Sequence, residues 1–483
     1  MAMQINPEMP ANAAGIAFTV VTGLVMLVLP RRYAVGPVMV TCCYMTMGQS
    51  IVVAGCHFTM IRILMLIGWS RVFLRGEIRA LKLNRLDRTI LWWIAVNCVA
   101  YVILWHNGDA IVYKLGVAYD VIGYYFLFRM LLHDLDDILN IFRITSVLLI
   151  PLAGFILLEK STGRNMFSVF GGVSPVTMVR DGVLRCSGPF SHPILAGTFG
   201  ATIMPLVASI WLDGGIGRLL AICGVASAVV ITIASGSSGP VLALMAAVLA
   251  LCMWPLRKKM QWIRRGCAIG MICLQMVMKV PIWFLLARVD VFNGSTGFHR
   301  AMLIDGAFRH LGGWWLIGTK STLAWADRDQ GLFDVTNQYL FVGSEGGLFS
   351  MLLFIWIIVV AFRYVGLARR AMERIGEPLA NQGCVWALGA ALLAHAVSYI
   401  SVSYFDQNFV NWYLLLAMIV TVWEQFRVAS VEPESEVTVE EEEKGAEEED
   451  LVTVGSGSSI WWRELTVFPI FASCCPVSAQ TTQ

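Results

Sequence analysis

Charged residues are scarce in this 483-residue chain. Only 14% of the residues are Asp, Glu, Lys or Arg, whereas a soluble domain carries about 25%. Hydrophobic residues make up 57% of the chain, and its mean hydropathy is +0.69. The chain has 12 cysteines but lacks a Cys-x-x-Cys pair or a histidine cluster with metal-binding spacing. These deficits exclude a soluble globular protein, and we expect neither a metal nor another cofactor.

Apolar runs of about 20 residues recur from one end of the chain to the other. As a helix, each run is long enough to cross a hydrocarbon core about 30 Å thick. The pattern predicts an all-α polytopic membrane protein with about 12 or 13 transmembrane helices. We place the spans at residues 14–30, 35–54, 56–73, 89–105, 113–132, 138–158, 192–212, 218–234, 239–255, 266–286, 338–362, 382–404 and 409–425.

Lysine and arginine gather in alternate loops between these spans. Short loops rich in Lys and Arg stay on the cytoplasmic side. This rule places the N-terminus outside and the C-terminus in the cytoplasm; an interfacial first helix would remove one span and change nothing else. The basic residues concerned are Arg31, Arg32, Arg71, Arg75, Arg79, Lys82, Arg85, Arg88, Arg257, Lys258, Lys259, Arg264, Arg265, Arg363, Arg369, Arg370 and Arg374.

Two predicted outer loops are much longer than the other connections. Long connections in a compact protein are usually functional or disordered, and the aromatic and glycine content of these two predicts that they fold over the outer face. The Glu-rich end predicts a disordered cytoplasmic tail. The chain thus divides into N-terminal transmembrane helices (1–158), a first outer loop (159–191), central helices (192–286), a second outer loop (287–337), C-terminal helices (338–428) and the acidic tail (429–483).

The segment RDGVLRCSGPFSHP, Arg180 to Pro193, is the most informative part of the first outer loop. Arg180 and Arg185 offer planar, permanently charged groups that suit phosphate oxygens, and topology does not favour arginines outside. His192 stands at the start of a predicted span, where free backbone N–H groups attract anions. We expect this turn and Arg185 to share a pyrophosphate, with His192 able to move a proton. The structural alternative is that His192 caps the helix.

Ionisable residues inside predicted spans are candidates for a functional role, because placing a charge in the lipid bilayer costs free energy. They are Arg62, Asp120, Lys279 and His395, and Arg129 lies near a span end. Arg62 is a candidate to line the path of a lipid phosphate. For Arg129 we prefer an interaction with the cytoplasmic surface.

Four segments resemble the O-antigen ligase and O-antigen polymerase family, in the family's order and on one predicted side of the membrane. They cover roughly residues 180 to 360. Arg185-x-x-Gly-x-Phe-x-His-Pro resembles a family segment that opens a span, and ASGSSGPVLAL resembles its Ser-x-Ser-Arg-Gly turn. GFHRAMLIDGAFRHLGGWWLIG is similar to its stretch of an arginine, a helix and Gly-x-Gly. TNQYLFVGSEGGLFSMLLF resembles its His-Asn-x-x-Leu…Glu-x-Gly-Leu segment.

The resemblance implies a multi-span, GT-C-like glycosyltransferase in the bacterial cytoplasmic membrane, with its active site on the outer face. The donor would be a glycan on an isoprenoid pyrophosphate, and the acceptor lipid A-core or another glycan. The reaction would invert the anomeric carbon without nucleotide sugar, metal or cofactor, and nucleic acid would have no role. Arg180, Arg185, Arg300 and Asn337 would bind the substrate.

The chain departs from the family pattern at two positions. Thr336 stands where ligases carry a histidine, and Ser238 stands where the serine-rich turn carries arginine. The first departure removes the expected base of a ligase and favours a polymerase or a related transferase. His299 and His310 are possible substitutes. Glu345 is a further catalytic candidate, and its structural alternative is a salt bridge to an outer-loop arginine.

Two other functions remain open at this point. A flippase or exporter of lipid-linked glycan would need a ladder of cationic residues through the spans, whereas this chain concentrates its outer cations in two loops. The third hypothesis is a membrane scaffold without enzymatic activity, because Thr336 replaces the histidine of the ligases.

Overall fold

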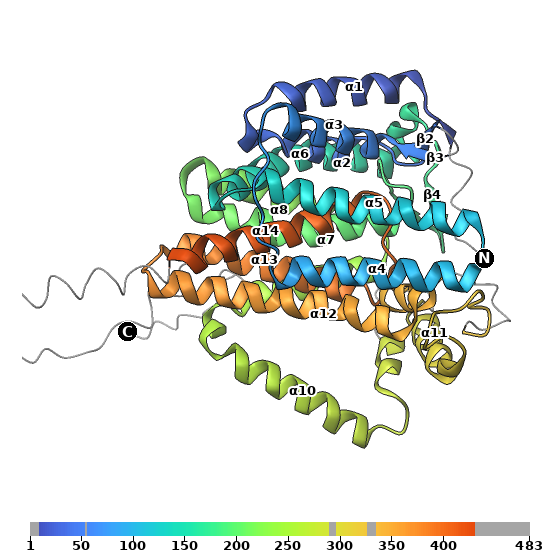
Figure 1. Cartoon of the computed structure of the whole chain (residues 1–483). Helices are drawn as coiled ribbons and strands as arrows, with labels where there is room; N and C mark the ends of the chain where they lie inside the picture. Colours follow the sequence, from blue (N-terminus) through green and yellow to red (C-terminus); the bar gives the residue numbers. More distant parts are fainter. Residues whose placement is uncertain (1–8, 54–55, 289–295, 326–334, 430–483) are drawn as a thin grey trace, which may run out of the picture.

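The structure is a computed structural model, and it describes residues 9–53, 56–288, 296–325 and 335–429. Most helices lie side by side in one bundle (Figure 1). Helices suit these apolar sequences because lipid offers no partner to backbone N–H and C=O groups. The helices are α1 (Ala13–Val28), α2 (Gly36–Tyr44), α3 (Met60–Leu74), α4 (Arg85–Trp105), α5 (Gly108–Leu131), α6 (Leu135–Thr162), α7 (Pro193–Ser209), α8 (Gly215–Ala234), α9 (Ser238–Cys252), α10 (Met260–Val277), α11 (Thr296–Arg309), α12 (Gln338–Arg374), α13 (Leu379–Ser398) and α14 (Gln407–Ala429).

Short 3-10 helices connect several of these elements. The helices α7 and α14 lie at the centre of the bundle and are buried along most of their length. Hydrophobic packing around them forms the main core. The 3-10 helices are η1 (Arg31–Tyr33), η2 (Met166–Phe170), η3 (Ile210–Asp213), η4 (Trp254–Lys259), η5 (Ile282–Arg288) and η6 (Leu311–Gly313).

The prediction of a helical span at 35–54 is wrong. The helix α2 has only nine residues, and the chain then forms a hairpin of β2 (Gln49–Val53) and β3 (Cys56–Thr59), with Ile51 opposite Phe58. The strand β1 (Met9–Pro10) pairs with β2 in parallel. Apolar periodicity alone does not separate a strand from a buried helix, and the β-branched run here favours a strand. The fold is therefore predominantly, but not entirely, α-helical.

The number of helices that can span a membrane is lower than predicted. Within the described ranges, seven helices are long and apolar enough to cross a membrane, and up to eight if α9 and the following η4–α10 segment, bent by 78°, form one span. The other predicted spans correspond to helices that are shorter, such as α1 and α3, or less apolar, such as α13. The polytopic membrane class stands, and the count of 12 or 13 is too high by this criterion.

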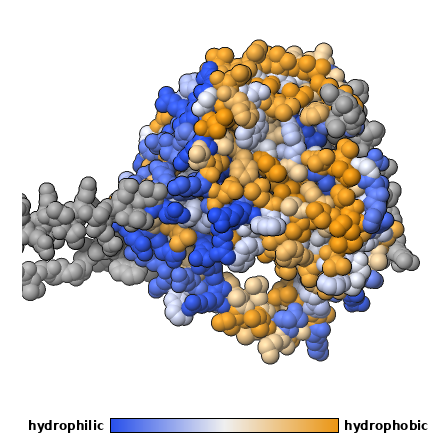
Figure 2. Space-filling view, in the orientation of Figure 1, coloured by the Kyte–Doolittle hydropathy of each residue, from blue (hydrophilic) through white to orange (hydrophobic). Residues whose placement is uncertain are grey.

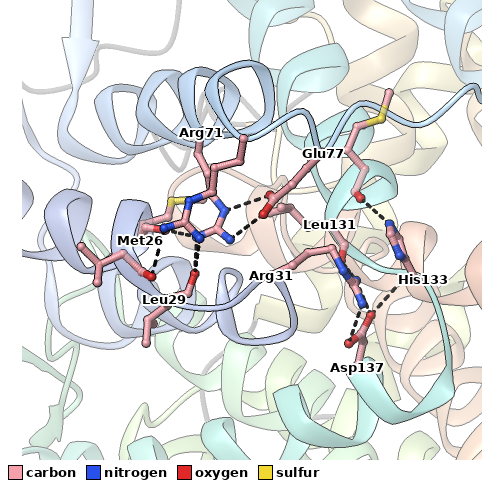
Figure 3. Close-up of polar contacts among 11 residues, drawn as sticks. Met26, Leu29, Arg31, Arg71, Glu77, Leu131, His133 and Asp137 are labelled. Carbon is pink, nitrogen blue, oxygen red and sulfur yellow. Dashed lines mark hydrogen bonds and ion pairs between the residues drawn. The ribbon is translucent and has the colours of Figure 1, made fainter.

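Basic loops and long outer loops lie at opposite ends of the bundle. At one end, Arg31 donates to Asp137 of α6 at 2.6 Å, and Arg71 forms two hydrogen bonds with Glu77 (Figure 3). Figure 2 shows hydrophilic residues gathered at this end. The helix α6 has 28 residues and is therefore about 42 Å long. Its other end carries Glu159, which binds the first outer loop.

Three buried basic residues inside the bundle are each paired with a carboxylate. A buried charge is costly unless an opposite charge and hydrogen bonds compensate it. The pairs of Lys114 and Arg129 join α5 to α12 and to α14, and each pair neutralises the cation that forms it. The pairs are Arg71 with Glu77 at 2.8 Å, Lys114 with Glu345 at 2.7 Å, and Arg129 with Glu424 at 2.8 Å.

The helix α12 is broken at Gly347, whose φ of 76° and ψ of 178° are not helical. The second outer loop fills the break: Thr319 N–H donates to Ser344 O, and Leu348 N–H donates to Trp315 O, both at 2.8 Å. A Cβ atom on Gly347 would lie 2.4 Å from a backbone oxygen of this loop. The break therefore holds the second outer loop against the bundle.

Replacement of Gly347 by Ala should destabilise the protein by about 1–3 kcal/mol from backbone strain alone, and the clash with the loop should add to this. Gly366, in the same helix, is the matched control, because a Cβ atom there would meet nothing within 4 Å. Thermal unfolding of the two variants in detergent measures the difference. Equal melting temperatures would contradict the strain argument.

The helix α10 stands apart from the bundle (Figure 1). None of its residues is buried, and it packs mainly against η4 and η5 at its two ends. Figure 2 shows an open gap between this helix and the rest of the molecule. We call the segment from η4 through α10 to η5 the α10 arch.

Candidate anion site at the α8–α9 turn

The first outer loop is folded, as predicted from its composition. The strands β4 (Met178–Arg180) and β5 (Val183–Arg185) form an antiparallel hairpin. The carboxylate of Glu159 accepts hydrogen bonds from the backbone N–H of Ser187 at 3.1 Å and of Gly188 at 2.8 Å. The loop is thus held to the end of α6, and the position of Arg185 is fixed with it.

Arg185 is the best-placed residue of this loop for binding an anion. It is only 8% exposed, and its Nε donates to Ser235 O at 3.3 Å while its Nη2 donates to Ser237 Oγ. No carboxylate of the described residues lies within ion-pair distance of it, in contrast to Arg71 and Arg129. Burial and the positive charge of Arg180 lower the pKa of Arg185. A buried cation without a counter-ion favours the arrival of an anion.

The residues Ser235–Ser238, which we call the serine turn, bring the two outer loops together. Arg300 of α11 lies 3.5 Å from Ser238 Oγ through its Nη1. Ser237 binds Arg185 and Ser238 contacts Arg300, and consecutive Cα atoms are about 3.8 Å apart. The two guanidinium groups, from different loops, therefore meet at adjacent residues.

The end of α13 completes this site. A Cβ atom on Gly239 would lie 2.4 Å from Ser401 Oγ and 3.5 Å from Arg300 Nη2. Ser238, Arg300 and Ser401 line one small cleft. Asn337, at the start of α12, donates to Ile400 O at 3.2 Å. Of the four segments that carry the family resemblance, one contains the serine turn and two contact it through Arg185 and Arg300. The fourth reaches the neighbouring residue Ile400 through Asn337, and Ile400 lines the same cleft.

Asn337 and His192 both cap helices. Asn337 is 4% exposed, and its side chain accepts from Leu340 N–H at 3.1 Å. His192 Nδ1 accepts from Ile194 N–H at 3.2 Å, and His192 O accepts from the next two N–H groups of α7. The first turn of α7 therefore has no backbone N–H left for an anion, contrary to the prediction, and the capping alternative for His192 is correct.

Capping also fixes the proton of His192. Because Nδ1 accepts a hydrogen bond, the neutral ring carries its proton on Nε2. Burial, Arg185 and Arg180 lower the pKa of His192 to about 4. A neutral ring with its basic nitrogen occupied is a hydrogen-bond donor and not a ready base, so the structure argues against the predicted catalytic role.

Protein stability should fall as the pH falls through the window between about 6.5 and about 4. In this window the unfolded chain binds a proton at His192 and the folded protein does not, so stability rises with pH. Replacement by Asn, which also caps helices, should remove the part of this dependence that His192 contributes. Melting temperatures of the wild type and His192→Asn at pH 7 and pH 5 test this. An equal loss in both proteins would assign the pH effect to another group.

Arg180, Arg62 and Glu345 are not brought to the serine turn by any contact of the described structure. Arg180 has a side chain 46% exposed and lies 3.6 Å from Asp181. Arg62 binds Asp120 through two hydrogen bonds of 2.8 and 2.5 Å. Glu345 accepts from Lys114, not from the loop arginine considered above. Arg62 and Glu345 each form an ion pair away from the serine turn, and Arg180 lies close to Asp181.

His299 precedes Arg300 in α11, and its side chain is half-buried. The next residue, Arg300, contacts Ser238 of the serine turn. His299 is therefore close in sequence to this turn.

Asp406 was not predicted as part of this region. It follows α13, adopts a φ of 60°, and accepts from Ser191 N–H at 2.9 Å and from Ser191 Oγ. Burial raises its pKa. This carboxylate holds the residue before His192, across 215 positions of sequence. No local pattern around Asp406 indicates that contact.

Metal-binding clusters of three or more His, Cys, Asp or Glu residues do not occur within the described part of the chain. Neither a scan of protein-family models nor a search of curated proteins finds a match to this chain. The function must therefore be argued from the site itself.

Proposed function

We propose that this protein is a membrane glycosyltransferase that uses an isoprenoid-pyrophosphate-linked glycan as donor. The observation that carries the proposal is Arg185, a buried guanidinium that pairs with no carboxylate of the described residues, at the turn that also contacts Arg300. Two arginines from separate loops match a doubly charged pyrophosphate, since guanidinium groups bind phosphate oxygens in pairs. The contact of two family-like segments with this turn, which is itself a third, supports the same proposal.

The reaction is a single displacement at the anomeric carbon of the donor. An acceptor hydroxyl attacks this carbon, its C–O bond to the lipid pyrophosphate breaks, and the lipid pyrophosphate leaves with the bonding electron pair. Arg185 and Arg300 stabilise the charge that develops on the leaving group. The acceptor hydroxyl gives its proton to a base. The product has the inverted configuration.

His299 is the base that we favour among the predicted candidates. Glu345 is bound to Lys114 at 2.7 Å, and the free nitrogen lone pair of His192 is occupied by Ile194 N–H. His299 is adjacent in the chain to Arg300, which would hold the leaving group. A base must reach the acceptor hydroxyl at hydrogen-bond distance in the substrate complex.

A multi-span, GT-C-like enzyme of the bacterial cytoplasmic membrane is the setting that fits this chemistry. The basic loops lie at the end of the bundle opposite to the serine turn, and basic loops favour the cytoplasm. The site then faces outward, where lipid-linked glycans meet a glycan or lipid acceptor, and the C-terminus is cytoplasmic. The acidic tail, residues 430–483, lies outside the described residues.

Transport of the lipid-linked glycan is the alternative function. A flippase would need unpaired cations along the bundle, but Arg62, Lys114 and Arg129 are each bound to a carboxylate. These pairs favour the transferase over the flippase.

The test supplies a short-glycan isoprenoid pyrophosphate to the purified protein and reads the products by mass. Longer glycans on the lipid, with release of isoprenoid pyrophosphate, would support a polymerase, which Thr336 favours. Glycan on a separate acceptor would support a ligase-type transferase. Absence of turnover with every acceptor, together with transbilayer movement of the lipid in liposomes, would refute the transferase.

A further inference from the structure

The helix α14 ends at the basic end of the bundle, where Figure 2 shows hydrophilic residues (Figures 1 and 2). Near this end, Glu424 accepts from Asn84 Nδ2 at 3.1 Å. The next residue, Gln425, accepts from the backbone N–H of Leu135, at the start of α6, at 2.9 Å. The chain therefore continues beyond Ala429 from a point beside the connection between α3 and α4, to which Asn84 belongs.

That connection presents positive charge to solvent. Its two carboxylates bind inner partners: Glu77 pairs with Arg71 at 2.8 Å, and the buried Asp87 accepts from Asn84 N–H at 2.9 Å and from Tyr125 OH at 2.6 Å. Four exposed cations, three residues apart in the sequence, form what we call the basic loop: Arg79, Lys82, Arg85 and Arg88. In the part of the chain that the structure describes, no carboxylate lies within ion-pair distance of these four side chains.

The positive charge of the basic loop is also felt by a neighbouring connection, the one between α5 and α6. Burial and the charges of Arg31 and Arg79 lower the pKa of His133 there. Like charges at one end of a bundle repel one another, so an anion gains Coulomb energy with each cation that it meets. Because the four cations are spread over residues 79–88, the loop matches an extended chain of negative charges better than it matches a single phosphate.

The sequence that follows α14 supplies such a chain of negative charges. Residues 432–450, which we call the acidic run, contain eleven Asp and Glu residues and one lysine. Glu432 stands eight positions after Glu424, and eight extended residues span up to about 28 Å. The acidic run therefore begins within reach of the basic loop. A short tether of this kind gives a millimolar effective concentration, so individually weak ion pairs are sufficient for binding.

We propose that the acidic run, residues 432–450, docks on the basic loop of its own chain. The contact neutralises the loop and covers the junction between α4 and α14. Exposed ion pairs are weak and are screened by salt, so the run is held by several pairs together and is released as the ionic strength rises. The inference concerns the end of the bundle opposite to the serine turn and does not depend on the proposed function.

Carbodiimide cross-linking of the purified full-length protein tests the proposal, because this reagent joins a carboxylate to a lysine amine in contact with it. In liposomes of phosphatidylcholine and phosphatidylglycerol, mass spectrometry should find the acidic run joined to Lys82 in preference to Lys259. Lys259 is the matched control, since it is exposed and lies in η4 of the α10 arch, beside Lys258, which pairs with Glu373 near the end of α12.

Two double variants separate the basic loop from net charge. Arg79→Gln with Arg88→Gln should lower the yield at Lys82 about three- to tenfold, because two exposed ion pairs are lost. Arg264→Gln with Arg265→Gln removes the same charge from α10 and should leave the yield unchanged. All four side chains are exposed, and melting temperatures equal to that of the wild type verify that both variants fold.

Three results would overturn the proposal. Equal yields at Lys82 and Lys259 would identify the acidic run as a solvated tail. Loss of the Lys82 product when phosphatidylglycerol is added to phosphatidylcholine liposomes would assign the basic loop to anionic lipid head groups. Equal reductions in the two double variants would assign the effect to net charge alone. Absence of glycan transfer would refute the proposed function and leave the cross-linking result unaffected.

Discussion

Replacement of Arg185 by Ala should reduce glycan transfer by about 10²–10³-fold, the usual effect of removing one group that stabilises developing negative charge. Arg185 is 8% exposed and is oriented by Ser235 and Ser237, so its loss leaves the leaving group without a preorganised partner. Arg185→Lys should recover part of the activity, because lysine keeps the charge and loses the planar fork. The rate of donor consumption, read by mass, measures both variants.

Thermal stability distinguishes a role of Arg185 in binding the leaving group from a structural role. A buried charge without a counter-ion is costly, so Arg185→Met should melt at the same temperature as the wild type or at a higher one. Arg180→Ala is the matched control, since Arg180 is exposed and lies beside Asp181; it should lose less than about tenfold in rate. A large drop in melting temperature in Arg185→Met, with activity lost only in proportion to unfolding, would make Arg185 a structural residue.

Replacement of Lys114 by Met should destabilise the protein by about 3–5 kcal/mol, because it leaves a buried carboxylate unpaired. The Lys114 side chain is 2% exposed, and its Nζ lies 2.7 Å from both Glu345 Oε2 and Asn97 Oδ1. Tyr113 OH donates to the same Glu345 carboxylate at 3.0 Å. The pair joins α5 to α12 just before the break at Gly347.

Removing both charges should restore most of the lost stability. Apolar replacements for both members of a buried pair are often neutral, so Lys114→Met with Glu345→Leu should melt close to the wild type. Melting temperatures of the two single variants and the double variant give the coupling between the residues. The transfer activity of a folded double variant then decides the role of Glu345. Retained activity would show that Glu345 has a structural role. Loss of activity in the folded double variant would make Glu345 a candidate for the catalytic base again.

The sequence predicted the polytopic helical class, but not the number of spans. Charge distribution separated the basic loops from the two long loops. The order of four motifs placed Arg185, the serine turn and Arg300 on one predicted side of the membrane, and in the structure both arginines contact that turn. The hairpin of β2 and β3 was missed because residues 51–58, IVVAGCHF, carry one polar side chain, that of His57. In such a run the periodicities of a strand and a buried helix are indistinguishable.

The roles of single residues depended on partners far away in the sequence. Glu345 and Lys114 are 231 positions apart, so the residue types alone did not distinguish a base from half of an ion pair. His192 and Asn337 lie at helix starts, where capping and substrate binding use the same side-chain atoms. The position of each residue was predictable, whereas its hydrogen-bond partner was not.

Arg71 also has a consequence for the synthesis of the protein. Its guanidinium donates to the carbonyls of Met26 and Leu29, at the end of α1 (Figure 3). Terminal carbonyls of a helix need such partners when water is excluded. Arg71 is made 42 residues after Leu29, so α1 leaves the ribosome before the group that completes it. The end of α1 is therefore completed only when α3 packs against it, and we expect these two helices to fold as one cooperative unit.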